Sequence, residues 1–218
     1  MGAHSVPSRK RSARVRALLA GGLVLGIGGT VTLAAWTDAE NASGTFAASR
    51  FSIEANVSNP YSATAPWTVN ETAPGATLAF DAAGMYPEKI TYAPIALRTR
   101  PGSVSGSATL LGAQVTDTPG TEPRLGAALV YRVVLSQACN AEAFRPGASF
   151  IVGSDTTFAP LTTGQRPDAL AVLAPAGAST PGASTHFCFQ VTLPKDADQR
   201  LQGTSATAVW RFSAESTQ

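Results

Sequence analysis

Few residues of this 218-residue chain could carry out acid–base or metal chemistry. His186 is the single histidine after residue 35, and it lies two residues before Cys188. The segment Gly102-Ser103-Val104-Ser105-Gly106 has valine where a hydrolase nucleophile elbow needs serine. The sequence contains neither a His-Glu-x-x-His zinc motif nor a phosphate-binding Gly-Lys-Ser/Thr loop. We therefore expect no catalytic residue, no cofactor and no metal site, and predict that the chain is not an enzyme.

Two pairs of carboxylates could bind a cation at the surface. Asp38 lies two residues from Glu40, and Asp196 lies two residues from Asp198. Calcium sites in proteins use several oxygen ligands at defined spacings within one loop, and neither pair belongs to such a pattern. We expect both pairs to lie in solvated turns.

Other side chains could contact or carry a sugar. Trp67, Tyr131 and Trp210 are candidates for a sugar-binding face, but aromatic residues at strand spacing more often belong to a core. Three segments match the glycosylation triplet, which matters only in a host that glycosylates: Asn41-Ala42-Ser43, Asn56-Val57-Ser58 and Asn70-Glu71-Thr72. Neither observation identifies a site.

The first 35 residues have the order of a secretory signal peptide. Five basic residues between Arg9 and Arg16 precede an uncharged run at residues 17–35, and the first acidic residue is Asp38. The positive-inside bias holds the cationic end at the cytoplasmic face while the apolar run inserts into the membrane. We therefore predict that residues 1–35 are a signal peptide.

The end of this run predicts the cleavage site. Ala34 and Ala35 supply the small residues that a signal peptidase needs, so we expect cleavage between Ala35 and Trp36. Residues 36–218 would then form a single secreted, extracellular or cell-surface domain that meets the membrane only during export. The run of 19 residues is also nearly long enough for a permanent membrane anchor, and this alternative stays open.

Cleavage would reverse the sign of the net charge. The whole chain has 16 basic and 14 acidic residues, a formal net charge of +2. Five of the basic residues and none of the acidic ones lie before residue 36, so the exported part would have 11 basic and 14 acidic residues, a net charge of −3. Nucleic-acid binding needs a basic surface, so we expect no nucleic-acid partner.

Cys139 and Cys188 are the two cysteines of the chain. Cysteine pairs in exported proteins are typically oxidised, so we predict a disulfide between them. It would close a loop of about 50 residues and stabilise the fold by roughly 4 kcal/mol on the chain-entropy model. Free thiols or metal ligands are the alternative, although few other ligands accompany these cysteines.

An alternation of apolar and polar residues with a period of two recurs after residue 36 and is typical of strands with one buried face. Pro-Gly and Asn-Pro pairs mark turns between the alternating stretches. We expect long surface loops within residues 153–184, which are rich in Gly, Ala, Pro, Ser and Thr. The pattern predicts an all-β fold, an antiparallel β-sandwich of jelly-roll-like topology, preceded by the helix of the signal. The predicted strands are 45–57, 76–80, 90–98, 107–115, 129–135, 150–152, 170–173, 185–193 and 206–212.

The segment from Gly28 to Phe51 resembles the export signal and early mature region of the TasA and camelysin (CalY) family, whose members are processed by a signal peptidase of the SipW type. The matching elements are the glycine-rich apolar run, the junction Ala34-Ala35-Trp36-Thr37-Asp38 and the element Ala42-Ser43-Gly44-Thr45. The closing stretches, Cys188 to Pro194 and Leu201 to Ser216, look like the end of actinobacterial relatives that carry the same signal.

The resemblance implies an exported structural protein of the cell surface or biofilm matrix. In the fibre-forming members an N-terminal strand of one subunit completes the sheet of the next. Here that donor strand would come from residues 36–51, which include Thr45, Phe46, Ala47 and Phe51. The implied partners are the SipW-type signal peptidase and other copies of the chain. The alternative is that this strand folds back into its own domain.

Two other functions stay open. A monomeric surface binding module or adhesin would use the same all-β domain to bind a ligand. A camelysin-like peptidase would make the chain an enzyme, but one histidine and no zinc motif locate no such site.

Overall fold

The computed structural model describes residues 15, 16, 18, 19, 48–72, 76–78, 80 and 84–217. The chain divides into two compact units, Met1–Phe46 and Ala47–Gln218, and the described residues of the first unit are helical. No helix in the described part of the chain is long and apolar enough to cross a membrane. The predicted cleavage site between Ala35 and Trp36, and Thr45, Phe46 and Ala47 of the predicted donor strand, lie outside the described residues.

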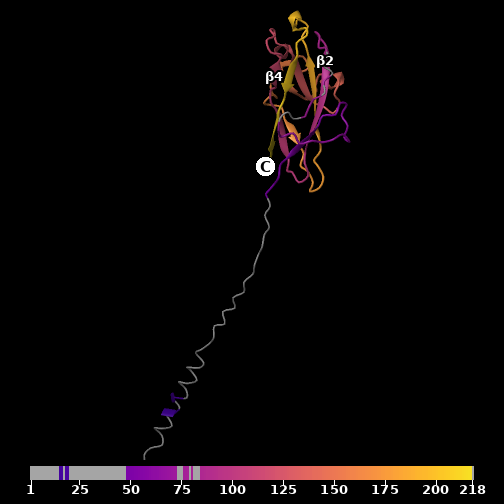
Figure 1. Ribbon diagram of the computed structural model, residues 1–218. Helices are drawn as coiled ribbons and strands as arrows, with labels where there is room; N and C mark the ends of the chain where they lie inside the picture. Colours follow the sequence, from indigo (N-terminus) through magenta and orange to yellow (C-terminus); the bar gives the residue numbers. More distant parts are fainter. Residues whose placement is uncertain are drawn as a thin grey trace, which may run out of the picture. The chain divides into compact units, whose positions relative to one another are not determined.

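The second unit is built from antiparallel strands in two layers (Figure 1). The first layer consists of β1 (Ile53–Asn56), β2 (Ile90–Thr99), β5 (Val130–Leu135), β6 (Phe150–Val152), β7 (Ala159–Pro160) and β9 (Thr185–Thr192). Its strand order is β1-β2-β9-β5-β6, and β7 also pairs with β5. β9 therefore lies in the interior of the sheet, between β2 and β5.

The second layer consists of β3 (Gly106–Leu110), β4 (Gln114–Asp117), β8 (Ala171–Leu173), β10 (Ala206–Val209) and β11 (Phe212–Ser216). β3 lies between β8 and β11, and β4 pairs with β10. Between the two pairings the Leu111 N–H donates to the Arg211 carbonyl at 2.8 Å. The stretch β3–β4 and the stretch β10–β11 therefore form one bent, two-stranded ribbon.

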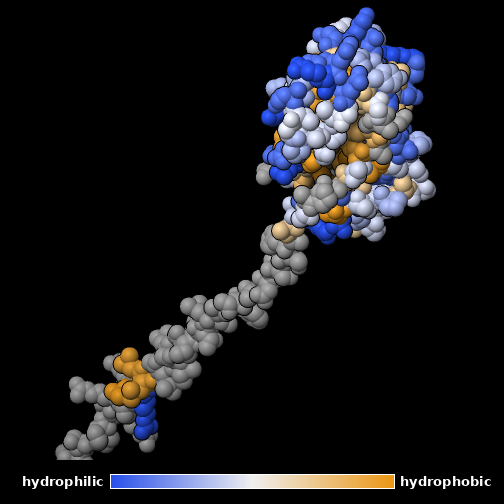
Figure 2. Space-filling view, turned by 45° about the horizontal axis from the view of Figure 1, so that its top comes forward, coloured by the Kyte–Doolittle hydropathy of each residue, from blue (hydrophilic) through white to orange (hydrophobic). Residues whose placement is uncertain are grey.

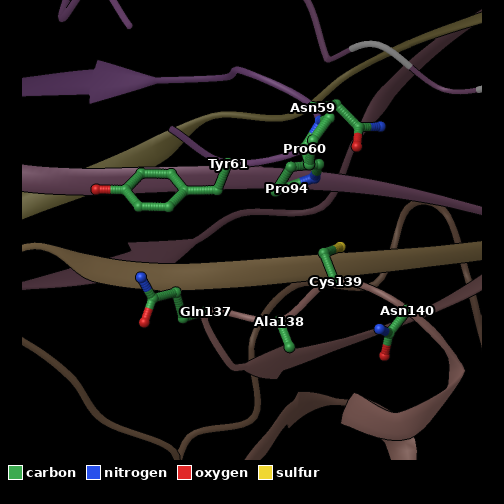
Figure 3. Close-up of a pocket in the computed structure, with 8 residues that line it drawn as sticks. All are labelled: Asn59, Pro60, Tyr61, Pro94, Gln137, Ala138, Cys139 and Asn140. Carbon is green, nitrogen blue, oxygen red and sulfur yellow. The ribbon is translucent and has the colours of Figure 1, made fainter. Parts of the chain in front are cut away.

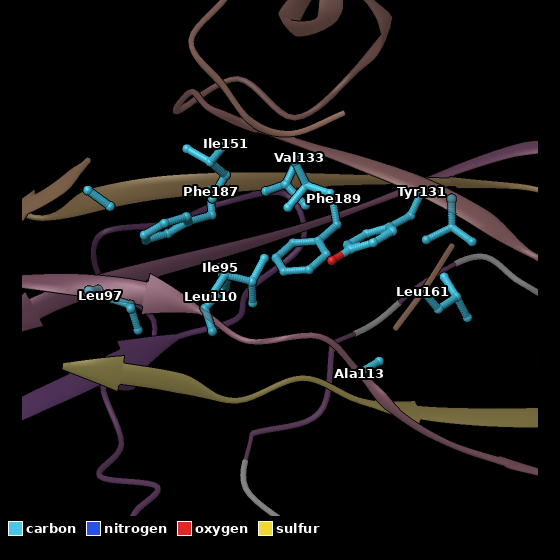
Figure 4. Packing of buried hydrophobic residues seen from close by; sticks show 14 of the residues in the cluster. Ile95, Leu97, Leu110, Ala113, Tyr131, Val133, Ile151, Leu161, Phe187 and Phe189 are labelled. Carbon is cyan, nitrogen blue, oxygen red and sulfur yellow. The ribbon is translucent and has the colours of Figure 1, made fainter. Parts of the chain in front are cut away.

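An apolar core joins the two layers (Figure 4). Phe187 and Phe189 of β9 and Tyr131 of β5 are fully buried and face the second layer. Trp210 and Phe212 meet them from that layer, with ring centroids 5.2 Å apart for Phe189 and Trp210 and 4.8 Å apart for Phe187 and Phe212. This packing of two inner faces confirms the predicted antiparallel β-sandwich.

Five of the predicted strands, those at 90–98, 129–135, 150–152, 170–173 and 185–193, are present, and none of their bounds differs by more than one residue. The strand predicted at 107–115 is divided into β3 and β4, and the strand predicted at 206–212 is divided into β10 and β11. Residues 111–113 on one side face only residues 210 and 211 on the other, so Val209 pairs with Gln114 whereas Phe212 pairs with Leu110. A bulge of this kind interrupts the ladder while the apolar alternation continues, which is why the sequence pattern did not reveal it.

Two predictions at the beginning of the domain fail in part. The strand expected at 45–57 is limited to Ile53–Asn56 among the described residues. The strand expected at 76–80 is wrong for residues 76–78 and 80, which adopt no strand conformation. Leu78 and Phe80 nevertheless pack against the core, so the apolar pattern there reflects burial without strand pairing.

Three short helical turns also occur among the described residues of the second unit: α2 (Leu125–Ala128), η1 (Ala141–Phe144) and η2 (Gln199–Leu201). The predicted disulfide between Cys139 and Cys188 is present. It ties the loop that carries η1 to the outer face of β9, where a small second core forms from Val134, Phe144, Phe150 and Cys188.

Candidate functional site

His186 lies on β9 and faces away from the core, on the side opposite to Phe187. Its Nε2 atom is 2.9 Å from Ser184 Oγ, and the Tyr61 ring packs edge-on against the imidazole with centroids 4.4 Å apart. Over the described ranges, no group of three or more His, Cys, Asp and Glu side chains could hold a metal ion. These contacts fit a histidine that positions Tyr61.

The pH dependence of stability offers a test of this environment. Burial lowers the pKa of His186 below its ordinary value of 6.5. His186 then binds a proton more readily in the unfolded chain than in the folded chain. The contribution of neutral His186 to stability is therefore complete above pH 6.5 and is lost as the pH falls. H186N should therefore lose less stability than the wild type between about pH 7.5 and pH 5 in urea unfolding. An identical pH dependence in the two proteins would contradict this prediction.

Asp196 and Asp198 occupy a solvated turn before η2. Asp198 accepts hydrogen bonds from the Arg200 backbone and side chain, and these hydrogen bonds lower the pKa of the Asp198 carboxyl. Asp196 is exposed two residues earlier. The other carboxylate pair, Asp38 and Glu40, lies outside the described residues.

The N-terminal strand begins with residues that pack into their own domain. The Arg50 carbonyl accepts a hydrogen bond from the Val104 N–H at 3.0 Å. The Phe51 side chain is half-buried against the core beside Gly106, where an added Cβ would come within 2.5 Å of the Phe51 ring. From Arg50 onward, the N-terminal segment thus folds back onto its own domain, as in the alternative to strand exchange.

The β10–β11 strand forms an edge of the second layer. The Thr217 N–H donates to the Ser105 carbonyl at 3.0 Å and the Leu111 N–H to the Arg211 carbonyl, so the odd-numbered residues of β11 bond to β3. In an antiparallel ladder, successive residues point their backbone groups to opposite sides. The even-numbered residues Phe212, Ala214 and Ser216 therefore point their N–H and C=O groups away from β3. These groups have no backbone partner among the described residues.

The apolar side chains of this edge are incompletely covered. Every second residue from Ala208 to Ala214 packs against the core, and each of these side chains is only half-buried. The corresponding side chains of β9, such as Phe187 and Phe189, are fully buried. Apolar side chains reach the surface at several places on the domain face in Figure 2. Unpaired backbone groups beside partly open apolar side chains make a surface to which another strand can add. We call this strand, Ala206–Ser216, the open edge.

A groove of about 430 Å³ lies on the outer face of the first sheet (Figure 3). Residues 59–61 form one wall, residues 137–140 form the other, and Pro94 of β2 lies between them. Figure 3 shows Tyr61 and Gln137 toward one end of the groove, and Asn59 and Asn140 toward the other. None of the eight lining residues is charged.

Buried Asn56 supports the first wall. Its Nδ2 donates to the Ser62 carbonyl at 2.8 Å, and its Oδ1 accepts from the Ser58 N–H at 3.0 Å. The Asn56 side chain is therefore enclosed in the folded domain, and its glycosylation triplet is not accessible there. Asn70, in the second triplet of the described residues, is exposed.

The second wall is held by the Cys139–Cys188 disulfide and by Arg132. The Arg132 guanidinium lies 5.1 Å from the centre of the Phe144 ring and 4.5 Å from that of Phe158. It also donates to the Asp155 carbonyl at 2.6 Å. These contacts link the loop that carries η1 to the loop at residues 155–158 on this side of the sheet.

The three aromatic residues considered as a sugar-binding face lie apart from the groove. Tyr131 is fully buried in the core and donates to the Thr163 carbonyl, and burial raises the pKa of Tyr131 to about 12. Trp210 belongs to the open edge and packs on Phe189. Trp67 lies on the outer face of the sheet, with the Arg98 guanidinium 3.9 Å from its ring centroid.

Sequence reasoning found neither the groove nor the open edge. Tyr61 and Gln137 stand 76 residues apart in loops, where periodicity carries no signal. The only features that pointed to this region were the turn pair Asn59-Pro60 and the predicted disulfide. No known protein-family model and no curated protein matches the chain.

Proposed function

We propose that this chain is an exported, non-enzymatic structural protein of the cell surface or biofilm matrix, which assembles when the N-terminal segment of one copy adds to the open edge of another. The observation that carries this proposal is the open edge itself. Its outward backbone groups, such as those of Phe212 and Ala214, have no partner among the described residues.

Adding a strand to the open edge would both pair its backbone groups and bury its apolar side chains. A strand laid beside β11 would bond the free N–H and C=O groups. It would also cover Phe212 and Ala214, which are half-buried although they point toward the core. Natural sheets usually protect such an edge with charges, proline or a covering segment, and the inward positions from Ala208 to Ala214 hold neither charge nor proline.

The donor would come from the residues that precede the domain. Arg50 and Phe51 are already bonded or packed in their own chain, so the segment available for exchange ends before them. Residues 36–47 contain the polar stretch from Thr37 to Ser43, followed by Thr45 and Phe46, which favour strands. The signal sequence would place this segment outside the cell, where cleavage at Ala35 would free it.

Removing the donor segment should abolish assembly. A protein of residues 36–218 is expected to form oligomers or fibres, whereas a protein of residues 48–218, which keeps every contact of Arg50 and Phe51, should stay monomeric. Light scattering and negative-stain microscopy of the oxidised proteins would measure the difference. Equal assembly of both proteins would refute the donor segment, and unchanged urea unfolding would show that the shorter protein is folded.

A proline in the open edge tests the acceptor. Ala214→Pro removes an N–H that points away from β3, so it deletes no hydrogen bond of the monomer and should block strand addition. Val172→Pro in β8 is the matched control, because the Val172 N–H points away from β3 at the opposite edge of the same layer. Assembly of residues 36–218 should be lost only with Ala214→Pro. Loss with Val172→Pro alone would place the acceptor at β8.

A further inference from the structure

We propose that the groove between Tyr61 and Gln137 binds a neutral saccharide. The site lies on the outer face of the first sheet, whereas the open edge belongs to the second layer. The proposal therefore stands independently of assembly. The volume of about 430 Å³ lies within the range of about 300–1,000 Å³ that is common for small-molecule sites.

The amide groups of the groove suit hydroxyl groups. A side-chain amide carries a donor and an acceptor on neighbouring atoms, so it can bond two adjacent hydroxyls of a sugar. Gln137 is exposed and makes no hydrogen bond to the described residues. The Asn140 Oδ1 accepts from the Glu142 N–H at 3.0 Å, which fixes the Asn140 side chain at the end of its wall. Asn59 is fixed in the same way, since its Nδ2 donates to the Tyr92 carbonyl at 3.3 Å.

The Tyr61 ring supplies the apolar part of the site. Its edge contact with the His186 ring, at an interplanar angle of 87° between the two rings, fixes the orientation of the Tyr61 ring. The ring is half-buried and lines the groove. The C–H groups of a pyranose can pack on such a ring while its hydroxyls reach the amides, which matches the mixture of apolar and polar surface in small-molecule sites.

The lack of charged residues in the groove limits the classes of ligand that it can bind. None of its lining residues is acidic or basic, so it offers no partner for a phosphate, a uronic acid or a charged peptide. An extended peptide that adds to a sheet edge needs backbone N–H donors, but the β2 residue that lines the groove is Pro94, which has no N–H and already pairs with Cys188 of β9. A neutral sugar needs neither feature.

Both walls are held before any ligand arrives. The Cys139–Cys188 disulfide fixes one wall, and the hydrogen bonds of buried Asn56 fix the other. A groove that does not have to order its loops on binding loses less entropy, which favours even a weakly bonding ligand such as a sugar.

Calorimetric titration of residues 48–218 with neutral tetrasaccharides tests the proposal. Residues from Ala47 onward form a separate compact unit, and this protein lacks the proposed donor segment, so the result does not depend on assembly. The probes are cellotetraose, maltotetraose, chitotetraose and mannotetraose, with tetragalacturonate as the charged probe. At least one neutral probe should bind with a Kd below about 1 mM.

Two variants locate the binding. Tyr61→Ala and Gln137→Ala should each raise the Kd about tenfold, which is the expected effect of losing one well-placed contact. Tyr86→Ala and Gln202→Ala are the matched controls, because both side chains are exposed outside the groove, and they should leave the Kd unchanged. The exposed Gln137 can be truncated without disturbing the core.

Three results would overturn the proposal. The first is the absence of heat for every neutral tetrasaccharide at about 10 mM. The second is wild-type affinity in both Tyr61→Ala and Gln137→Ala, which would move the binding elsewhere on the domain. The third is equal or tighter binding of tetragalacturonate, which would assign the site to an anionic ligand.

Discussion

Replacing Cys139 and Cys188 with alanine is expected to lower the free energy of unfolding by about 4 kcal/mol. The two cysteines are separated by 49 positions, and the disulfide between them removes conformational entropy from the unfolded chain. Alanine is preferable to serine because Cys188 is fully buried beside Val134 and Phe144, where a hydroxyl would add a separate cost. The melting temperature should fall on the order of 10 °C for a domain of this size.

Urea unfolding of residues 48–218 with and without dithiothreitol measures this contribution. The reductant should destabilise the wild-type protein by about as much as the double alanine variant does, and it should have no effect on the variant. A loss smaller than about 1 kcal/mol would mean that the reduced chain is still constrained in its unfolded state. Such a result would contradict the entropic account of this disulfide.

The sandwich could be predicted because its central strands obey the rule of alternation. In β9, Phe187 and Phe189 point toward the core, while His186 and Cys188 point outward. One face of this strand meets the second layer across the whole core, so polar residues are excluded from it. The predicted bounds of residues 185–193 accordingly match β9 to within one residue.

The strands were harder to predict where a buried segment does not pair with a neighbouring strand. Leu78 and Phe80 are apolar because they cover the core, yet the described residues around them form no strand. The ribbon formed by β3–β4 and β10–β11 keeps its alternation across a bulge, so its interruption at Trp210 leaves no mark on the pattern. Periodicity reports which side of a segment is buried and says little about its hydrogen bonds.

The groove could not be predicted because its residues meet only through the tertiary fold. Tyr61 stands on a loop that Asn56 holds in place, and Gln137 stands on a loop that the disulfide ties to β9. Neither loop has a periodic pattern, and amides are frequent in ordinary turns. The pairing of Pro94 with Cys188 across β2 and β9 brings the two loops to one face of the sheet.

Phe189→Ala is expected to destabilise the domain by about 3–5 kcal/mol, the cost of a cavity in a rigid core. Phe189 has no exposed surface, and its ring contacts Tyr131 in its own layer and Trp210 and Phe212 in the other. It therefore links both layers at once. Neighbouring strands hold β9 on both sides, so the backbone cannot collapse into the space left by the ring.

A graded series of variants separates this cavity effect from a general loss of apolar surface. Phe189→Leu leaves a smaller cavity and should cost less than Phe189→Ala, whereas Leu170→Ala, at a side chain that is 65% exposed, should change the free energy of unfolding by less than about 0.5 kcal/mol. Urea unfolding of residues 48–218 gives all three values. A cost below about 1 kcal/mol for Phe189→Ala would contradict this account. It would mean that the open edge, which carries Trp210, moves to fill the void, so that the packing of the two layers does not depend on the Phe189 ring.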